Sequence, residues 1–133
     1  MSTPTIPTRR LRILLIEDHA DTLETVTLLL RKSGHDVVAA ANCAQARAHA
    51  AESDNIEAVV GDLGLPDGDG LDLLVELKQQ YNCPTIALTA YGMDTDVKRC
   101  AAAGVDRHLL KPVGVTELAR TLDTLCPTPT PAS

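Results

Sequence analysis

Short apolar runs alternate with longer amphipathic stretches through the middle of the chain. Each run is apolar almost throughout, which is typical of parallel strands that are covered on both faces. The five predicted strands are residues 13–16, 37–41, 58–60, 85–88 and 108–110. Five strand-then-helix units with short connections predict an α/β fold, in which one doubly wound parallel sheet has helices on both faces.

Signals for the starts and stops of helices fall in the gaps between these runs. Asp21 and Glu24 form a predicted capping pair for a first helix that ends at Gly34. A second helix opens at Asn42, three residues before Gln45. The remaining predicted helices follow residues 69–70, cover about 94–104, and carry Leu118, Leu122 and Leu125.

The two ends of the chain differ from its body in composition. Residues 1–10 and 126–133 are rich in Pro and Thr, which favours extended segments that bury no core. We therefore predict flexible tails there and a single domain over residues 11–125. A chain of 133 residues has room for one domain of ordinary size, so the function is expected to lie in this domain.

Composition argues against several classes of function. The net charge of −6 disfavours a nucleic-acid surface, which needs clustered Lys and Arg. The four cysteines are widely spaced, without zinc-ligand spacing, so reduced thiols in a cytoplasmic protein are expected. No apolar run is long enough to span a membrane, and the run that follows Arg9 and Arg10 is too short for an export signal.

Polar residues follow four of the five predicted strands, at the edge where parallel α/β sheets bind ligands. In strand order they are Glu17 and Asp18, Asp62, Thr89, and Lys111. Three carboxylates at one edge repel one another unless a hard cation lies among them, and such oxygen ligands suit Mg²⁺. With Mg²⁺ bound, one carboxylate can attack a phosphoryl group whose oxygens the lysine and the threonine hydroxyl contact.

These residues in this order resemble the receiver domain of two-component response regulators, over residues 11–125. The resemblance implies a flavodoxin-like sheet of five parallel strands in the order 2-1-3-4-5, with five helices. It also implies that Asp62 is the phosphorylation site, that Asp18 binds Mg²⁺ directly and that Glu17 acts mainly through water. Asp62 and the backbone carbonyl of Gly64 are the further metal ligands that it implies.

The same resemblance assigns the phosphate contact and the switch. It implies that Lys111 contacts the phosphoryl group, that its peptide bond to Pro112 is cis, and that the Thr89 hydroxyl moves toward the new phosphate. His108 stands where such domains usually have an aromatic switch residue. A half-exposed strand histidine without a switching role is the alternative interpretation of His108.

The expected function is a signalling switch that catalyses only its own phosphoryl transfer and dephosphorylation. The phosphoryl group would come from a phosphohistidine on a histidine kinase or a phosphotransfer protein. A downstream protein would bind the surface of the fourth helix, fifth strand and fifth helix, and a phosphorylation-dependent homodimer is a further expectation. The resemblance also implies that Gly64 and Tyr91 stand at positions that tune phosphoryl lifetime, which predicts a moderately long lifetime. Residues 106–113 are similar to receivers of hybrid histidine kinases, so the chain is expected to be such a receiver or a stand-alone regulator.

Other interpretations fit the polar residues less well. A haloacid-dehalogenase-like phosphohydrolase would need a DxD motif after the first strand, where residues 17–19 read Glu-Asp-His. A pseudo-receiver that only docks partners would lack a site residue, yet all of them keep suitable chemistry. Residues 67–70 lack the further ligands of a calcium loop, so they are predicted to form a turn into the third helix. His19, near the rim of the site, is predicted to face solvent.

Overall fold

The five predicted strands form one parallel sheet in the computed structural model, which describes residues 10–53, 55–89, 94–111 and 114–125. They are β1 (Arg12–Ile16), β2 (Asp36–Ala40), β3 (Ala58–Asp62), β6 (Thr85–Thr89) and β7 (Arg107–Leu110). Within the described residues their order is β2-β1-β3-β6-β7, which is 2-1-3-4-5 when these strands are counted along the chain. The predicted fold class and strand order are confirmed.

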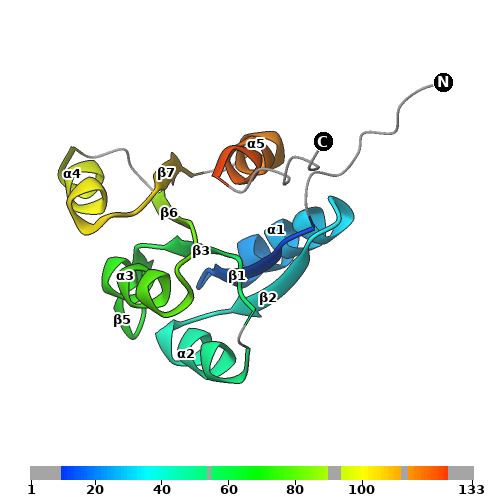
Figure 1. The fold of residues 1–133 in the computed structure, drawn as a ribbon, viewed down its shortest axis with the longest axis horizontal. Coiled ribbons are helices and arrows are strands. Elements are labelled where there is room, and N and C mark those ends of the chain that lie inside the picture. Colours follow the sequence, from blue (N-terminus) through cyan, green and yellow to red (C-terminus); the bar gives the residue numbers. More distant parts are fainter. Residues whose placement is uncertain (1–9, 54, 90–93, 112–113, 126–133) are drawn as a thin grey trace, which may run out of the picture.

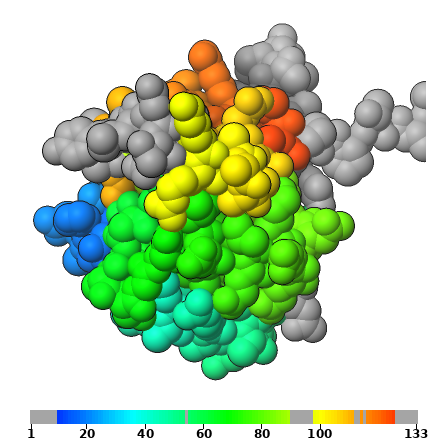
Figure 2. All heavy atoms as spheres, turned by 90° about the vertical axis from the view of Figure 1, so that its left-hand side faces the viewer, coloured from blue at the N-terminus to red at the C-terminus, as the bar shows by residue number. Residues whose placement is uncertain are grey.

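Helices cover both faces of this sheet (Figure 1). They are α1 (Ala20–Lys32), α2 (Cys43–Glu52), α3 (Gly70–Tyr81), α4 (Asp94–Ala103) and α5 (Val115–Leu125). α1 and α5 contact each other on one face, and α2, α3 and α4 lie side by side on the other. Figure 2 looks onto this second face, with α4 (yellow) above α3 (green) and α2 (cyan).

The strands contribute to two separate hydrophobic clusters, one on each face of the sheet. In β1, Leu14 and Ile16 pack with residues of α2 and α3, whereas Ile13 and Leu15 pack with residues of α1 and α5. All four side chains are buried. Successive side chains of a strand point to opposite faces, so a strand that is covered on both faces must be apolar throughout. This two-sided burial explains the continuous apolar runs in the sequence.

The predicted starts of the first two helices have different outcomes. Asn42 caps α2 as predicted, because its side chain accepts a hydrogen bond from Gln45 N–H at 2.8 Å. The prediction that Asp21 caps α1 is wrong, because the N-cap position is His19 and Asp21 lies in the first turn. Leu23 N–H donates to His19 O at 2.9 Å, so the first turn of the helix already contains Asp21. The capping position therefore lies two residues before Asp21. In the first turn, Asp21 is still favourably placed for the helix dipole.

A short antiparallel ribbon, which was not predicted, follows β3. It pairs β4 (Gly64–Leu65) with β5 (Gly68–Asp69). The prediction of a turn over residues 67–70 is therefore incomplete, because part of that segment is a strand. Asp69 also caps α3 by accepting a hydrogen bond from Leu71 N–H at 2.9 Å. Two-residue strands are too short to produce an alternating pattern in the sequence.

Several predictions concern residues that lie outside the described ranges. They are the tail over 126–133, the tail over 1–10 except for its last residue, the role of Tyr91, and the cis peptide bond at Pro112. Across the described part of the chain, no helix has both the length and the apolar character needed to cross a membrane.

Candidate functional site at the carboxyl edge of the sheet

Three carboxylates meet where β1 and β3 end. The parallel register between these strands brings Glu17 and Asp62 to neighbouring strand ends, and Asp18 directly follows Glu17. Oxygen atoms of these three side chains and a ring nitrogen of His19 all lie within 4.8 Å of one another. We call these four residues the acidic cluster. The structure thus brings together acidic side chains that come from separate segments of the sequence.

The Lys111 ammonium bridges two of these carboxylates. Its Nζ lies 2.6 Å from Glu17 Oε1 and 2.7 Å from Asp62 Oδ2. Lys111 follows β7, and its backbone N–H donates to Thr89 O at 2.7 Å, which extends the β6–β7 ladder past the end of β7. The backbone is therefore fixed, and the long side chain reaches across β6 to the end of β3.

Glu17 is the most buried carboxylate of the acidic cluster, with 1% of its surface exposed. Burial alone would raise the pKa of its carboxyl, but the Lys111 ammonium and the His19 backbone N–H outweigh burial and lower this pKa to about 2. The His19 N–H and the His19 ring Nδ1 each lie 3.3 Å from Glu17 Oε2. Glu17 is therefore ionised at neutral pH although it is buried.

Asp62 has a different electrostatic environment, although it shares the same lysine. Its pKa is raised, because burial and the charge of Glu17 outweigh the lowering effects of Lys111 and of the Gly64 N–H. Gly64 N–H donates to Asp62 Oδ1 at 3.3 Å, and Lys111 Nζ donates to Asp62 Oδ2. Burial would lower the pKa of Lys111, but the two carboxylates outweigh burial and raise it. The site thus holds one weakly basic and one more basic carboxylate around a single ammonium.

The two predicted switch residues lie in β6, which neighbours β3, and in β7, the next strand beyond β6. Thr89 ends β6 and is 3% exposed, and its hydroxyl lies 3.5 Å from the Leu109 carbonyl oxygen. Asp62 pairs with Leu88, one residue before Thr89, so the threonine stands beside the strand that carries Asp62. His108 lies in β7 with an exposed side chain. This conformation is the one that a strand histidine facing solvent would have, and a switching role for His108 stays a prediction.

The donor chemistry of the acidic cluster fits a hard divalent cation. Three carboxylates and one ammonium give a formal charge of −2, which one Mg²⁺ would balance. Among the described residues, Glu17 Oε1 makes no aligned hydrogen bond, although Lys111 Nζ is in contact with it. Glu17, Asp18 and Asp62 would hold the ion. Gly64 lies two residues after Asp62 and is an exposed residue of β4. Its carbonyl stays a predicted ligand of the metal.

The sequence did not predict that His19 would belong to the acidic cluster. Its side chain is 72% exposed, as predicted for a residue that faces solvent. Its Nδ1 nevertheless lies 3.3 Å from Glu17 Oε2 and 3.4 Å from Asp18 Oδ1. The signal for this contact is its place directly after the acidic pair, from which an imidazole can reach back to either carboxylate.

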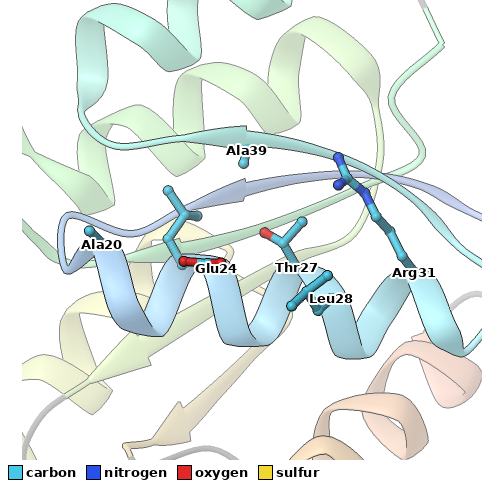
Figure 3. A pocket seen from close by; sticks show the side chains of 7 residues that line it. Ala20, Glu24, Thr27, Leu28, Arg31 and Ala39 are labelled. Atoms are coloured by element: carbon cyan, nitrogen blue, oxygen red, sulfur yellow. The ribbon is translucent and has the colours of Figure 1, made fainter.

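A surface groove of about 380 Å³ lies between α1 and β2 (Figure 3), and no residue of the acidic cluster lines it. Its lining consists of Ala20, Leu23, Glu24, Thr27, Leu28, Arg31 and Ala39. Arg31 Nη2 is engaged with the backbone, because it donates to Val37 O at 3.1 Å. The groove therefore gathers no set of reactive groups, and the acidic cluster is the better candidate for a functional site.

Known proteins match most of this chain. The family model described as response regulator receiver domain matches residues 13–123. The transcriptional regulatory protein PdtaR of Mycobacterium tuberculosis is 30% identical over 107 residues, which are 80% of this chain and 52% of that protein. An uncharacterised 14.6 kDa protein of Leptolyngbya boryana is 32% identical over 117 residues, which are 86% of this chain and 88% of that protein. The chain thus spans about half the length of PdtaR and most of the Leptolyngbya boryana protein.

The fold comparison agrees with the sequence comparison. The crystal structure of a response regulator receiver domain protein from Clostridium thermocellum matches with a TM-score of 0.80 and 26% identity. The match covers 86% of this chain and 93% of that one. The residues that the family model matches include the five strands of the sheet, except for the first residue of β1, and the span from Glu17 to Lys111. The chain therefore belongs to the family of receiver domains of two-component response regulators.

Proposed function

We propose that this receiver domain accepts a phosphoryl group on Asp62 with Mg²⁺ bound, from a phosphohistidine on a histidine kinase or a phosphotransfer protein. The observation that carries this proposal is the position of the Asp62 carboxylate. Its Oδ2 lies 2.7 Å from Lys111 Nζ, and its neighbours are Glu17 and Asp18. A carboxylate in contact with a fixed cation can receive a phosphoryl dianion that other carboxylates would repel.

The transfer forms an O–P bond and breaks a P–N bond. An oxygen of Asp62 attacks phosphorus in line with the donor imidazole, which leaves with the electron pair of the P–N bond. Lys111 would stabilise the charge on the transferring oxygens, because its ammonium already contacts Asp62. Bound Mg²⁺ supplies further positive charge to those oxygens.

The properties of Asp62 favour it over Glu17 as the acceptor. The pKa of Asp62 is raised and that of Glu17 is lowered to about 2, so an oxygen of Asp62 is the more basic nucleophile. Asp62 is 8% exposed and Glu17 is 1% exposed, so Asp62 is also the more accessible of the two. In this proposal Glu17 and Asp18 serve the metal ion.

The new phosphoryl group would be read out through the neighbouring strands. The Thr89 hydroxyl would leave the Leu109 carbonyl oxygen and bind the phosphoryl group, and the surface of α4, β7 and α5 would shift between two arrangements. A downstream protein or a second copy of this chain would bind that surface, to which the half-exposed Leu110 of β7 belongs. The domain would act in the cytoplasm as a switch rather than as an enzyme, either alone or as the receiver of a hybrid kinase.

Intact-mass measurement after incubation with acetyl phosphate and Mg²⁺ tests the proposal. We expect the wild type to gain the mass of one phosphoryl group and to lose it over minutes rather than seconds. Asp62→Ala should gain nothing. Asp72→Ala, which removes an exposed carboxylate from the first turn of α3, should behave like the wild type. A wild type that stays unmodified with Mg²⁺ present would rule out Asp62 as an acceptor.

A further inference from the structure

The ribbon of β4 and β5 follows Asp62 but is too small to hold its own shape. Each strand has two residues, and a two-stranded hairpin of this size is not stable by itself in water. Its shape matters to the site, because Gly64 N–H in β4 donates to Asp62 Oδ1 at 3.3 Å. Contacts outside the ribbon must therefore fix its conformation.

Asp67, in the turn between β4 and β5, makes such a contact with α2. Its Oδ1 accepts a hydrogen bond from Cys43 N–H at 2.8 Å, and its Oδ2 accepts one from Ala44 N–H at 3.0 Å. These two hydrogen bonds lower the pKa of Asp67, so its carboxylate is ionised at neutral pH. A negative charge is also favourable at the start of a helix.

Asp67 provides partners for two N–H groups at the start of α2. A helix leaves the N–H groups of its N-cap residue and of its first three helical residues without partners inside the helix. In α2, Gln45 N–H donates to the Asn42 side chain, and Ala46 N–H makes the first bond within the helix, to Asn42 O. Asp67 accepts from the N–H groups of the first two helical residues, Cys43 and Ala44. The tip of the ribbon and the start of α2 therefore form one hydrogen-bonded unit.

The other end of the ribbon is anchored independently. Asp69 Oδ2 accepts a hydrogen bond from Arg99 Nη2 of α4 at 2.8 Å. Gly70 N–H donates to Leu63 O at 2.8 Å, and a Cβ on Gly70 would overlap the Asp62 carbonyl oxygen. The base of the ribbon is thus held against β3 and α4, whereas its tip is held at α2 through Asp67.

We propose that Asp67 is a positioning residue of the phosphoacceptor site. By fastening the ribbon tip to α2, it holds the Gly64 backbone so that its N–H binds Asp62 and its carbonyl stays available to the metal. This inference rests on the proposed function, because it concerns Mg²⁺ bound beside Asp62. The coupling is reciprocal. If the fastened ribbon strengthens Mg²⁺ binding by a given free energy, bound Mg²⁺ stabilises the two Asp67 hydrogen bonds at α2 by the same free energy.

Mg²⁺ titrations by calorimetry of the wild type, Asp67→Ala and Asp67→Asn test the positioning role. We expect Asp67→Ala to weaken Mg²⁺ binding about fivefold or more. Asp67→Asn keeps one acceptor oxygen and should lose less. Asn42→Ala is the matched control, because it removes a cap from the same turn of α2 and leaves both Asp67 bonds in place. Its Mg²⁺ affinity should stay near that of the wild type, and urea denaturation of each variant would verify that all are folded.

Hydrogen exchange supplies a measurement that a purely structural role would not change. Saturating Mg²⁺ should slow the exchange of the Cys43 and Ala44 amides in the wild type, by about the factor by which Asp67→Ala weakens Mg²⁺ binding. Equal Mg²⁺ affinities of the wild type and Asp67→Ala, or exchange that Mg²⁺ leaves unchanged, would overturn the inference. If the wild type is then still phosphorylated by acetyl phosphate, the proposed function stands without it. A wild type that neither binds Mg²⁺ nor is phosphorylated would overturn both.

Discussion

Lys111 is the cation that the two most buried carboxylates of the site share. Its ammonium contacts a carboxylate with 1% exposure, Glu17, and a second one with 8% exposure, Asp62. The pKa of Glu17 is lowered because the attraction of Lys111 outweighs burial, whereas for Asp62 burial prevails. One lysine thus keeps a buried carboxylate ionised and also supplies positive charge at the proposed phosphoryl acceptor.

Replacing Lys111 with methionine keeps most of the length of the side chain and removes its charge. Without the opposing ammonium, burial should raise the pKa of Glu17 from about 2. A carboxyl with a lowered pKa stabilises the fold above its unfolded pKa, whereas one with a raised pKa stabilises it only at lower pH. We expect Lys111→Met to lose about 3 kcal/mol of unfolding free energy at pH 7.5, and less at pH 5. Urea denaturation at both pH values measures this loss.

Lys32→Met is the matched control for this change. Lys32 is exposed in the last turn of α1, so its replacement should alter the free energy of unfolding by no more than about 0.5 kcal/mol at either pH. A loss in Lys111→Met that is the same at pH 5 and pH 7.5 would contradict the assignment of the effect to Glu17.

Two glycines beside Asp62 differ in whether a side chain fits. A Cβ on Gly70 would overlap the Asp62 carbonyl oxygen and would lie 2.8 Å from Leu63 Cα, whereas a Cβ on Gly64 would meet nothing within 4 Å. Because the obstacle at Gly70 is backbone, we expect Gly70→Ala to lose about 2 kcal/mol or more of unfolding free energy. Gly64→Ala should lose less than about 1 kcal/mol. Chemical denaturation of both variants measures the difference, and equal losses would contradict it.

At the scale of elements, burial on two faces made the strands predictable. The central residues of β1, β3 and β6 are almost continuously apolar because each strand is covered on both sides. The prediction failed where one local contact decides the structure. α1 begins without the Asp21 cap, and the ribbon of β4 and β5 has strands too short to leave a pattern. The contacts of the ribbon with α2, β3 and α4 hold it in place, and the hydrophobic periodicity of the sequence does not reveal these contacts.

His35 connects the beginnings of β1 and β2. It is 6% exposed, and its Nδ1 accepts a hydrogen bond from Leu11 N–H at 3.1 Å, which requires an unprotonated Nδ1. Burial lowers the pKa of His35 and outweighs the opposite effects of Asp123 and Asp36. Folding therefore favours the neutral imidazole.

We expect the stability of the protein to fall as the pH is lowered from 7.5 to 5.5. A base with a lowered folded pKa contributes its full stability above its unfolded pKa of 6.5 and loses it as the pH falls toward the folded pKa. For one proton the slope is at most about 1.4 kcal/mol per pH unit. His35→Asn, whose Oδ1 can accept the same hydrogen bond, should flatten this slope in urea denaturation. His49→Asn should keep the slope, and a slope that persists in His35→Asn would contradict this role.

The whole molecule brings together residues that lie far apart in the sequence. Lys111 and Asp62 are 49 positions apart, and they meet because β3 and β7 flank β6 in one sheet. The predicted parallel sheet was enough to predict that the acidic residues and the lysine would share an edge. It did not predict that Lys111 also pairs with Glu17, or that Asp67 reaches the start of α2 across 24 positions. Those contacts depend on side-chain conformation and on the placement of a loop, which strand order does not fix.

Mg²⁺ should stabilise the whole fold, because the acidic cluster is assembled only when the sheet is formed. At a hundredfold excess over its dissociation constant, Mg²⁺ should raise the free energy of unfolding by about 2.7 kcal/mol, and removal by EDTA should reverse this gain. Asp18→Asn should shrink the gain, whereas Asp21→Asn, an exposed carboxylate outside the cluster, should keep it. NaCl at equal ionic strength separates general screening of the net charge of −6 from binding at the site. Equal responses of Asp18→Asn and the wild type to Mg²⁺ would mean that the stabilisation comes from that overall charge and not from this cluster.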